Sequence, residues 1–258
     1  MANTQVCSIP RPQARRGLFS AATIVATLTL LGAAPGAAQS TDAEPSKNWE
    51  AEVALGASLS TGNTDRKSVD VDAKASHRAG RFEDHYKLSG EFARESGSTT
   101  ASRVNGGVQS NYDITDRFYA LGFAEVERDR FSGFRYETEV ALGVGYRVID
   151  TDDLSFDVEL APGYRHGAIR GGGTDNKAFI RGSALLNYKI SDTATLTNEA
   201  TVSGESGQVR AENTLALTAT VVSDLAARLS FNIRYNSNPP AGAEKTDTIS
   251  KAQLVYAF

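Results

Sequence analysis

The fold is decided by the stretch Phe134–Val148, which reads FRYETEVALGVGYRV. Its even-numbered positions are apolar, apart from one threonine, and carry aromatic rings near both ends. Its odd-numbered positions are charged or small. Because successive side chains of a β-strand point to opposite faces of its sheet, this alternation predicts a strand with one apolar face and one wet face.

The same period of two recurs along the chain after residue 48. It is present, with varying clarity, in the segments 49–59, 69–73, 82–92, 101–112, 118–127, 154–164, 177–190, 195–204, 211–222, 229–235 and 252–258. Hydrocarbon offers no partner to a backbone amide, so a sheet in a membrane must close on itself. Strands of about 9 to 11 residues suffice to cross, and single-chain bacterial barrels have an even number of them. We therefore predict an all-β fold, an antiparallel up-and-down transmembrane β-barrel of about twelve strands.

The segment 118–127 allows two registers. Either Tyr119, Leu121 and Phe123 face the lipid, or Phe118, Ala120, Ala124 and Val126 do. The first choice would place Glu125 in hydrocarbon, where a charge is expensive, so we prefer the second.

The connections also alternate along the chain. Short turns end at Asp116, Asp150, Asp192 and Asp224, whereas the segments between them are richer in glycine and usually longer. Short periplasmic turns and longer outward loops would produce this alternation. The segment 166–176 is expected to be the longest outward loop.

A soluble β-sandwich is the main structural alternative. A sandwich would not need aromatic residues collected at strand ends, whereas a membrane barrel uses them as interfacial girdles. The carboxy-terminal segment adds a further mark, because Leu254, Tyr256 and Phe258 alternate up to the last residue. This pattern is similar to the sorting signal that the barrel-assembly machinery of Gram-negative bacteria reads. We therefore expect that machinery and outer-membrane lipid as partners.

The amino-terminal region predicts export. Arginines precede an apolar run over residues 18–31, and small residues follow up to Ala38, as in a cleaved secretory signal. We expect a signal peptide at 1–38, a polar linker at 39–48 and the barrel at 49–258, located in the bacterial outer membrane. The paired Arg15 and Arg16 weakly resemble a twin-arginine signal, but a barrel must cross the inner membrane unfolded, which favours the general secretory route.

Charge and cysteine content exclude other classes. Cleavage would remove three of the 27 basic residues and none of the 31 acidic ones, which leaves 24 against 31 and a formal charge of −7. Such a surface makes nucleic acid an unsuitable partner. Cys7 lies in the signal, so the mature chain would carry no thiol chemistry.

No catalytic constellation emerges, so we predict no enzyme, no cofactor and no metal. The chain has three histidines, His77, His85 and His166, and no serine lies near His166 in sequence. The best enzymatic alternative is a protease-like site that would gather Asp65, Asp129 and Asp175 with His166 at the outer rim.

The wet face is expected to line the lumen with charges of both signs. Its main candidates are Arg135, Glu137, Glu139, Arg147, Asp157, Glu159 and Arg181. In a barrel of this width such side chains could cross the lumen and pair, which predicts a narrow or closed passage without strong ion selectivity. Two functions stay open: a structural barrel of the envelope, which we favour slightly, and a narrow channel for small polar solutes or ions. The oligomeric state is also open.

Three motifs carry a resemblance to a known family. They are the segment 60–64 with Gly62 and Asn63, the string Glu127-Arg128-Asp129-Arg130-Phe131-Ser132-Gly133, and the segment 143–147. With them the chain resembles the YdiY-like family of bacterial outer-membrane β-barrels of unknown function, often labelled salt-stress-induced outer-membrane proteins. The resemblance implies the fold, the location and an association with osmotic stress. It implies no catalytic residues.

Overall fold

Twelve antiparallel β-strands make up the computed structural model, which describes residues 48–61, 66–95, 98–239 and 244–258. The strands are β1 (Trp49–Thr61), β2 (Arg66–Ala79), β3 (Phe82–Glu95), β4 (Ser98–Asp113), β5 (Phe118–Asp129), β6 (Phe134–Asp150), β7 (Leu154–Ile169), β8 (Thr174–Ser191), β9 (Ala194–Glu205), β10 (Gln208–Val222), β11 (Leu225–Asn236) and β12 (Thr246–Ala257). The predicted fold and strand number are confirmed.

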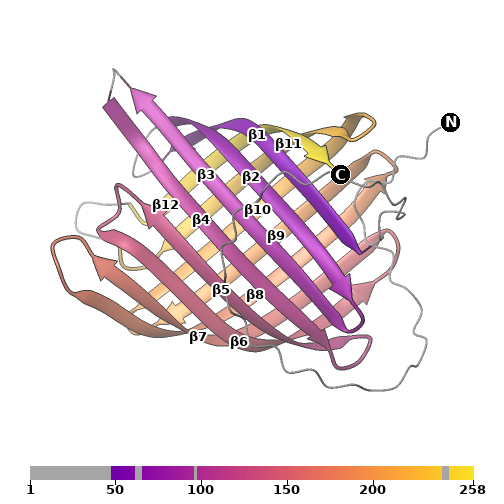
Figure 1. Ribbon diagram of the computed structural model, residues 1–258, viewed down its shortest axis with the longest axis horizontal. Helices are drawn as coiled ribbons and strands as arrows, with labels where there is room; N and C mark the ends of the chain where they lie inside the picture. Colours follow the sequence, from indigo (N-terminus) through magenta and orange to yellow (C-terminus); the bar gives the residue numbers. More distant parts are fainter. Residues whose placement is uncertain (1–47, 62–65, 96–97, 240–243) are drawn as a thin grey trace, which may run out of the picture. The chain divides into compact units, whose positions relative to one another are not determined.

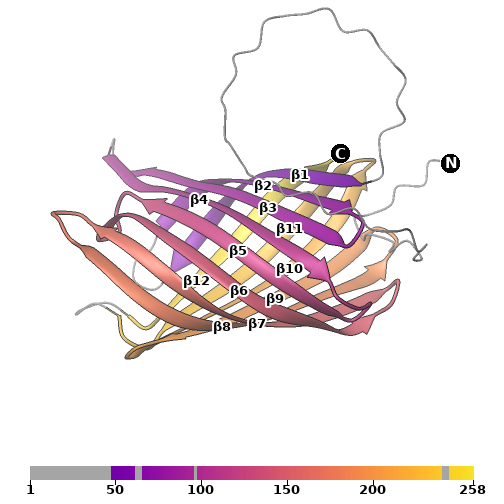
Figure 2. The same ribbon diagram turned by 60° about the horizontal axis from the view of Figure 1, so that its bottom comes forward.

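Each strand pairs with its neighbours in sequence, and β1 pairs with β12 to close the barrel (Figures 1 and 2). At the closure the backbone of Ala51 both donates to and accepts from that of Phe258, at 3.1 and 3.0 Å. The signal expected at 1–38 and the linker expected at 39–48, except its last residue, lie outside the described residues. No helix that is long and apolar enough to cross a membrane occurs in the described part of the chain.

The two faces of the wall have opposite chemistry. On β6, Val140, Leu142 and Val144 face outward and are 42–75 % exposed, whereas Ala141 and Gly145 at alternate positions are buried inside. An exterior made of exposed valine, leucine and aromatic side chains is stable only against hydrocarbon. The barrel is therefore built to span a membrane.

Aromatic rings collect where the outer face meets water. Where β1 begins, Trp49 stacks on His77 with ring centroids 4.3 Å apart, and the Tyr86 ring lies 6.0 Å from the Trp49 ring. Tyr and Trp favour the interface because each has an apolar body and a polar edge.

The register of β5 agrees with the preferred interpretation. Tyr119 and Leu121 are buried inside, Val126 is 48 % exposed outside, and Glu125 faces inward, where it accepts a hydrogen bond from Asn105 at 2.7 Å. The cost of placing a carboxylate in lipid outweighs the cost of turning aromatic rings toward the lumen.

The strands are longer than a bilayer crossing requires. The prediction that 166–176 forms the longest loop is wrong, because β7 runs to Ile169 and β8 begins at Thr174. His166 and Asn176 are paired within that ladder. Only four residues connect these strands, and Gly171, Gly172 and Gly173 have φ between +88° and +115°, a conformation that glycine adopts without strain. The connection between β11 and β12 is longer.

Candidate functional site

The lumen holds most of the predicted candidate charges. Glu137, Glu139 and Arg147 alternate with outward apolar residues on β6. On the next two strands the same holds for Asp157, Glu159 and Arg181. Arg135 is exposed and lies beside a register shift at the start of β6. The inner face is thus the place where this protein concentrates polar chemistry.

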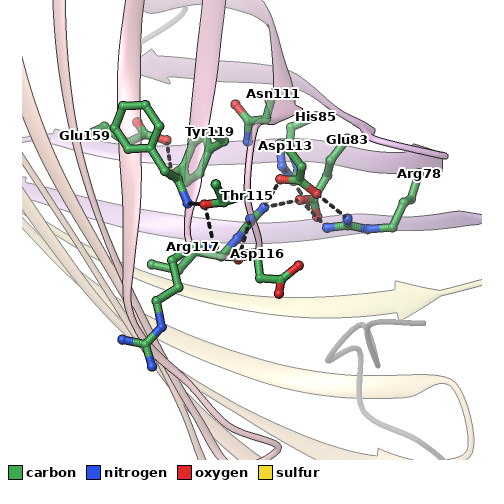
Figure 3. A network of polar contacts seen from close by, with 12 residues as sticks. Arg78, Glu83, His85, Asn111, Asp113, Thr115, Asp116, Arg117, Tyr119 and Glu159 are labelled. Carbon is green, nitrogen blue, oxygen red and sulfur yellow. Dashed lines mark hydrogen bonds and ion pairs between the residues drawn. The ribbon is translucent and has the colours of Figure 1, made fainter. Parts of the chain in front are cut away.

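A network of four charges closes the wall near the short turn between β4 and β5. The Arg147 guanidinium, in a residue only 3 % exposed, donates to Asp113 at 2.6 Å and to the carbonyl oxygen of Asp116 at 3.1 Å. Arg78 donates to Glu83 and, at 3.2 Å, to the other oxygen of Asp113 (Figure 3). Two arginines and two carboxylates therefore neutralise each other across β2, β3, β4 and β6.

A polar cluster around Glu159 lies beside this network. Its Oε1 accepts from the Tyr119 hydroxyl at 3.0 Å (Figure 3). The same oxygen accepts from Gln109 at 2.9 Å, and Oε2 accepts from Ser183 at 2.8 Å. These donors come from β4, β5 and β8. The Glu159 carboxylate on β7 is therefore linked to its neighbour β8 and also to β4 and β5, with which β7 does not pair.

An apolar cluster fills the same side of the lumen, which sequence reasoning did not predict. Tyr119, Leu121, Ala141, Ala161 and Phe179 pack together, with Phe123 against them. Each ring carries an arginine over its face: Arg147 over Tyr119, Arg165 over Phe179 and Arg181 over Phe123, at 4.8, 5.7 and 4.8 Å from the ring centroids.

Glycines on the neighbouring strands leave room for these rings. A Cβ atom at Gly145 would lie 2.1 Å from the Tyr119 ring, and one at Gly163 would lie 2.4 Å from the Phe179 ring. Glycine at inward positions of β6 and β7 was therefore the sequence signal for this cluster.

A second buried network joins β6, β7 and β9. Arg165, 6 % exposed, donates to Glu139 and to Glu205, both at 2.6 Å. Lys177 and Arg210 also approach Glu205, at 3.9 and 3.6 Å.

Beside it, four glutamates face one another on β5 and β6. Glu125 lies opposite Glu139 and Glu127 opposite Glu137, and with Arg210 they line a cavity of about 80 Å³. Directly opposed like charges destabilise a strand pair, so this part of the wall depends on the cations around it.

The middle of the lumen is more open. Arg228 makes a bidentate pair with Glu52 at 2.7 and 2.9 Å, and Lys74 lies 3.7 Å from the same carboxylate. Lys87 of β3 pairs with Glu199 of β9 at 3.4 Å. These strands are six positions apart in either direction around the ring, so the pair crosses the lumen. The side chains of Lys74, Lys87 and Glu199 are 40–55 % exposed, and water therefore reaches this level.

The protease-like constellation does not assemble. His166 bonds to Asn176 at 2.6 Å on the outer side, Asp175 pairs with Lys177, and Asp129 pairs with Arg103 at 2.9 Å. Asp65 lies outside the described residues. Among the residues that the structure describes, no group of three metal-ligating side chains converges.

The loop 127–133, one of the motifs on which the family resemblance rests, is held by its own side chains. Asp129 accepts from the backbone N–H of Phe131 at 2.8 Å, and the Ser132 hydroxyl donates to the Asp129 carbonyl oxygen at 3.1 Å. Arg130 and Gly133 are exposed, and Phe131 is 52 % exposed at the tip. Gly62 and Asn63 lie outside the described residues.

The three residues of the predicted assembly signal lie on the outer face. Leu254, Tyr256 and Phe258 are 52–71 % exposed, and the rings of Tyr256 and Phe258 lie 6.0 Å apart.

Comparison with known sequences identifies the family. The family model described as "Protein of unknown function, DUF481" matches residues 53–258. The chain belongs to the DUF481 family. The Uncharacterized protein YdiY of Escherichia coli (strain K12) is 24 % identical to this DUF481 chain over 220 residues, which cover 84 % of this chain and 86 % of YdiY. The resemblance to YdiY-like proteins is thus confirmed.

Solved structures similar to this DUF481 protein are outer-membrane barrels. The NanC porin is 12 % identical with a TM-score of 0.56, covering 79 % of this chain and 98 % of its own. The translocator domain of the autotransporter NalP from Neisseria meningitidis is 11 % identical with a TM-score of 0.53, covering 83 % and 90 %. The COG4313 outer membrane channel from Pseudomonas putida F1 is 9 % identical with a TM-score of 0.52, covering 82 % and 96 %. At these identities the likeness concerns the fold.

Proposed function

We propose that this DUF481 protein is a narrow outer-membrane channel for small polar solutes or ions, with its constriction at Lys87 and Glu199. The observation that carries the proposal is the half-exposed pair that these residues form across the middle of the lumen. A purely structural barrel has no need of solvated charges there, because its inner face could be filled by packed side chains. The similarity of fold to the NanC porin and to the COG4313 outer membrane channel also supports a channel.

The constriction would pass solutes without strong charge selection. Glu52, Arg228 and Lys74 lie at the same level and carry both signs, so an ion of either charge meets a partner and a repulsive group. A ring of one sign would select counter-ions, whereas interleaved signs neutralise each other.

Export and insertion complete the proposal. Residues 1–38 would act as the cleaved signal, and Leu254, Tyr256 and Phe258 as the mark for the barrel-assembly machinery. An exterior of exposed apolar side chains supports a location in lipid.

A structural role in the envelope, associated with osmotic stress, is the second candidate. It is favoured by the buried networks around Arg147 and Arg165, which join β6 to β4 and β6 to β7. A barrel kept for its mechanical stability would need these networks and no passage.

The test is planar-bilayer conductance of the refolded mature chain. We expect small, uniform current steps, and larger ones for the double variant K87Q/E199Q, which removes the crossing pair without changing the net charge. The matched control is K189Q/D192N, which removes an equally neutral pair between the end of β8 and the connection to β9, away from the crossing pair, and should leave the steps unchanged. Heat-modifiable gel migration verifies that each variant has folded. If folded protein inserts but passes no current in any variant, the channel is excluded and the structural role is the candidate that is left.

A further inference from the structure

The loop between β5 and β6 turns two arginines toward the outside of the barrel. On β5, Val126 faces outward, Asp129 faces inward to Arg103, and Arg128 is paired with the outward Val104, so Arg128 shares the outer face with them. Arg130 follows two residues later, and its backbone N–H continues the ladder by donating to Ser102 at 2.9 Å. Both arginine side chains are exposed.

Neither arginine is neutralised by a residue that the structure describes. Within the described part of the chain, no carboxylate forms an ion pair with Arg128 or Arg130, although Asp129 between them pairs with the luminal Arg103. Outward charges at this end of the described strands share one sign, namely Lys67, Arg94 and Arg128. A rim whose outward charges are all positive attracts anions.

The loop that carries them is preorganised. Arg170 donates to the carbonyl oxygens of Asp129 at 2.9 Å and of Ser132 at 3.2 Å, and its backbone N–H donates to Gly133 at 2.9 Å. Asp129 caps the turn from inside. Since the loop is already ordered, binding at Arg128 and Arg130 loses little backbone entropy.

Apolar and aromatic groups lie directly below and beside the two arginines. Val126 and Val140 are each 48 % exposed and Leu142 is 75 % exposed on the same outer wall. Tyr136, 42 % exposed, lies 6.0 Å from His166 at the edge of this strip. A guanidinium pair above a hydrocarbon-facing strip fits an amphiphile that has an anionic head and acyl chains.

We propose that Arg128 and Arg130 bind the phosphate groups of a phosphorylated glycolipid in the outer leaflet, whose acyl chains lie along the Val126–Leu142 wall. This end of the barrel is opposite to the start of β1 and the end of β12, and in even-stranded barrels it faces the cell exterior. Guanidinium groups bind phosphate in bidentate geometry, which an ammonium cannot match. The inference is independent of whether the lumen conducts.

The experiment measures lipid binding to the refolded full-length barrel by native mass spectrometry. The probes are bis-phosphorylated lipid A and its dephosphorylated form, and heat-modifiable migration verifies the fold of every variant. The matched control is R81Q/R117Q, which removes two exposed arginines from turns at the opposite end. We expect R128Q/R130Q to raise the dissociation constant for phosphorylated lipid A about tenfold or more, while the control changes it by less than about twofold.

Three results would overturn the proposal. The first is an unchanged affinity of R128Q/R130Q for phosphorylated lipid A. The second is equal binding of the dephosphorylated lipid by the unmodified barrel, since an apolar strip alone would explain it. The third is inorganic phosphate binding as tightly as lipid A, because the site would then recognise the free ion and not a lipid. R128K/R130K should bind with intermediate affinity, since it keeps the charge and loses the bidentate geometry.

Discussion

Arg147 and Lys87 are both cations inside the barrel, yet the protein holds them in opposite ways. The Arg147 guanidinium is buried against the wall, with Asp113 and a backbone carbonyl as acceptors and Tyr119 beneath it. The Lys87 ammonium is half exposed and reaches across the lumen to one carboxylate. A charge that is paired along the wall therefore stabilises the strands, whereas a charge that is paired across the lumen limits the width of the passage.

The strongest way to test this contrast is to remove Arg147. R147M leaves Asp113 and Glu83 short of a partner in a desolvated place, so we expect the free energy of unfolding to fall by about 3–5 kcal/mol. Denaturant titration of the barrel in lipid, followed by its gel shift, measures the loss. R117M, which removes an exposed arginine from the adjacent turn, should be nearly neutral. A loss below about 1 kcal/mol in R147M would show that the network is no stronger than a surface ion pair.

Overpacking the same wall should cost less. In G145V the new side chain would enter the volume of the Tyr119 ring, which would displace the ring from below Arg147. We expect a destabilisation of about 1–3 kcal/mol in the same titration. Combining it with Y119A should recover part of the loss, because the smaller side chain vacates the space. If the double variant is as unstable as the sum of the single variants, the two positions do not share that space.

Removing the crossing cation should affect stability still less and conduction more. K87M is expected to lower the free energy of unfolding by less than about 1 kcal/mol, since a half-exposed pair is well screened. The same variant should change the single-channel current, whereas R147M should not, provided that it folds. Equal effects of K87M and R147M on the free energy of unfolding would show that pairing along the wall and pairing across the lumen contribute equally to stability.

The smallest effect is expected outside the lumen, at the turn that follows β8. Asp192 accepts from Lys189 at 2.8 Å, and this ammonium lowers the pKa of the carboxyl below its ordinary value of 3.8. A lowered pKa stabilises the fold above the unfolded-state value, and the contribution disappears as the pH falls through the folded-state value. D192N should therefore alter the melting temperature only slightly at neutral pH and not at all in strong acid. A clear difference from the unmodified protein in strong acid would refute this assignment.

Period-two alternation predicted which residues face the lumen because that property is local to each strand. The inward positions of Glu139, Glu159 and Arg181 follow from their neighbours in sequence. The crossing pair does not, because Lys87 and Glu199 are 112 residues apart and meet only through the stagger of twelve strands. The sequence could predict that charges would pair across the lumen, but not which ones.

Loop lengths were harder to predict than faces. His166 and Asn176 looked like loop residues because they are polar and flank three glycines. In the structure their side chains bond to each other above the apolar band, where polar residues are compatible with a strand. Polar residues indicate where the outer face leaves the membrane and meets water, but the strands continue beyond that boundary. The luminal ring cluster was not predicted, because period-two alternation puts Tyr119 and Phe179 on the inner face but does not show which side chains of distant strands pack over them.

The pair between Lys87 and Glu199 also bears on the cross-section of the barrel. Because it joins two points that lie opposite each other on the ring, flattening that widens the β3–β9 diameter must stretch it, and flattening at right angles compresses it. Salt weakens such an exposed pair by screening. At low ionic strength the ion pair holds the distance between β3 and β9 near one value. At high ionic strength the pair is weaker, and the cross-section can become oval more easily. The shape of the lumen therefore depends on the ionic strength of the water that fills it.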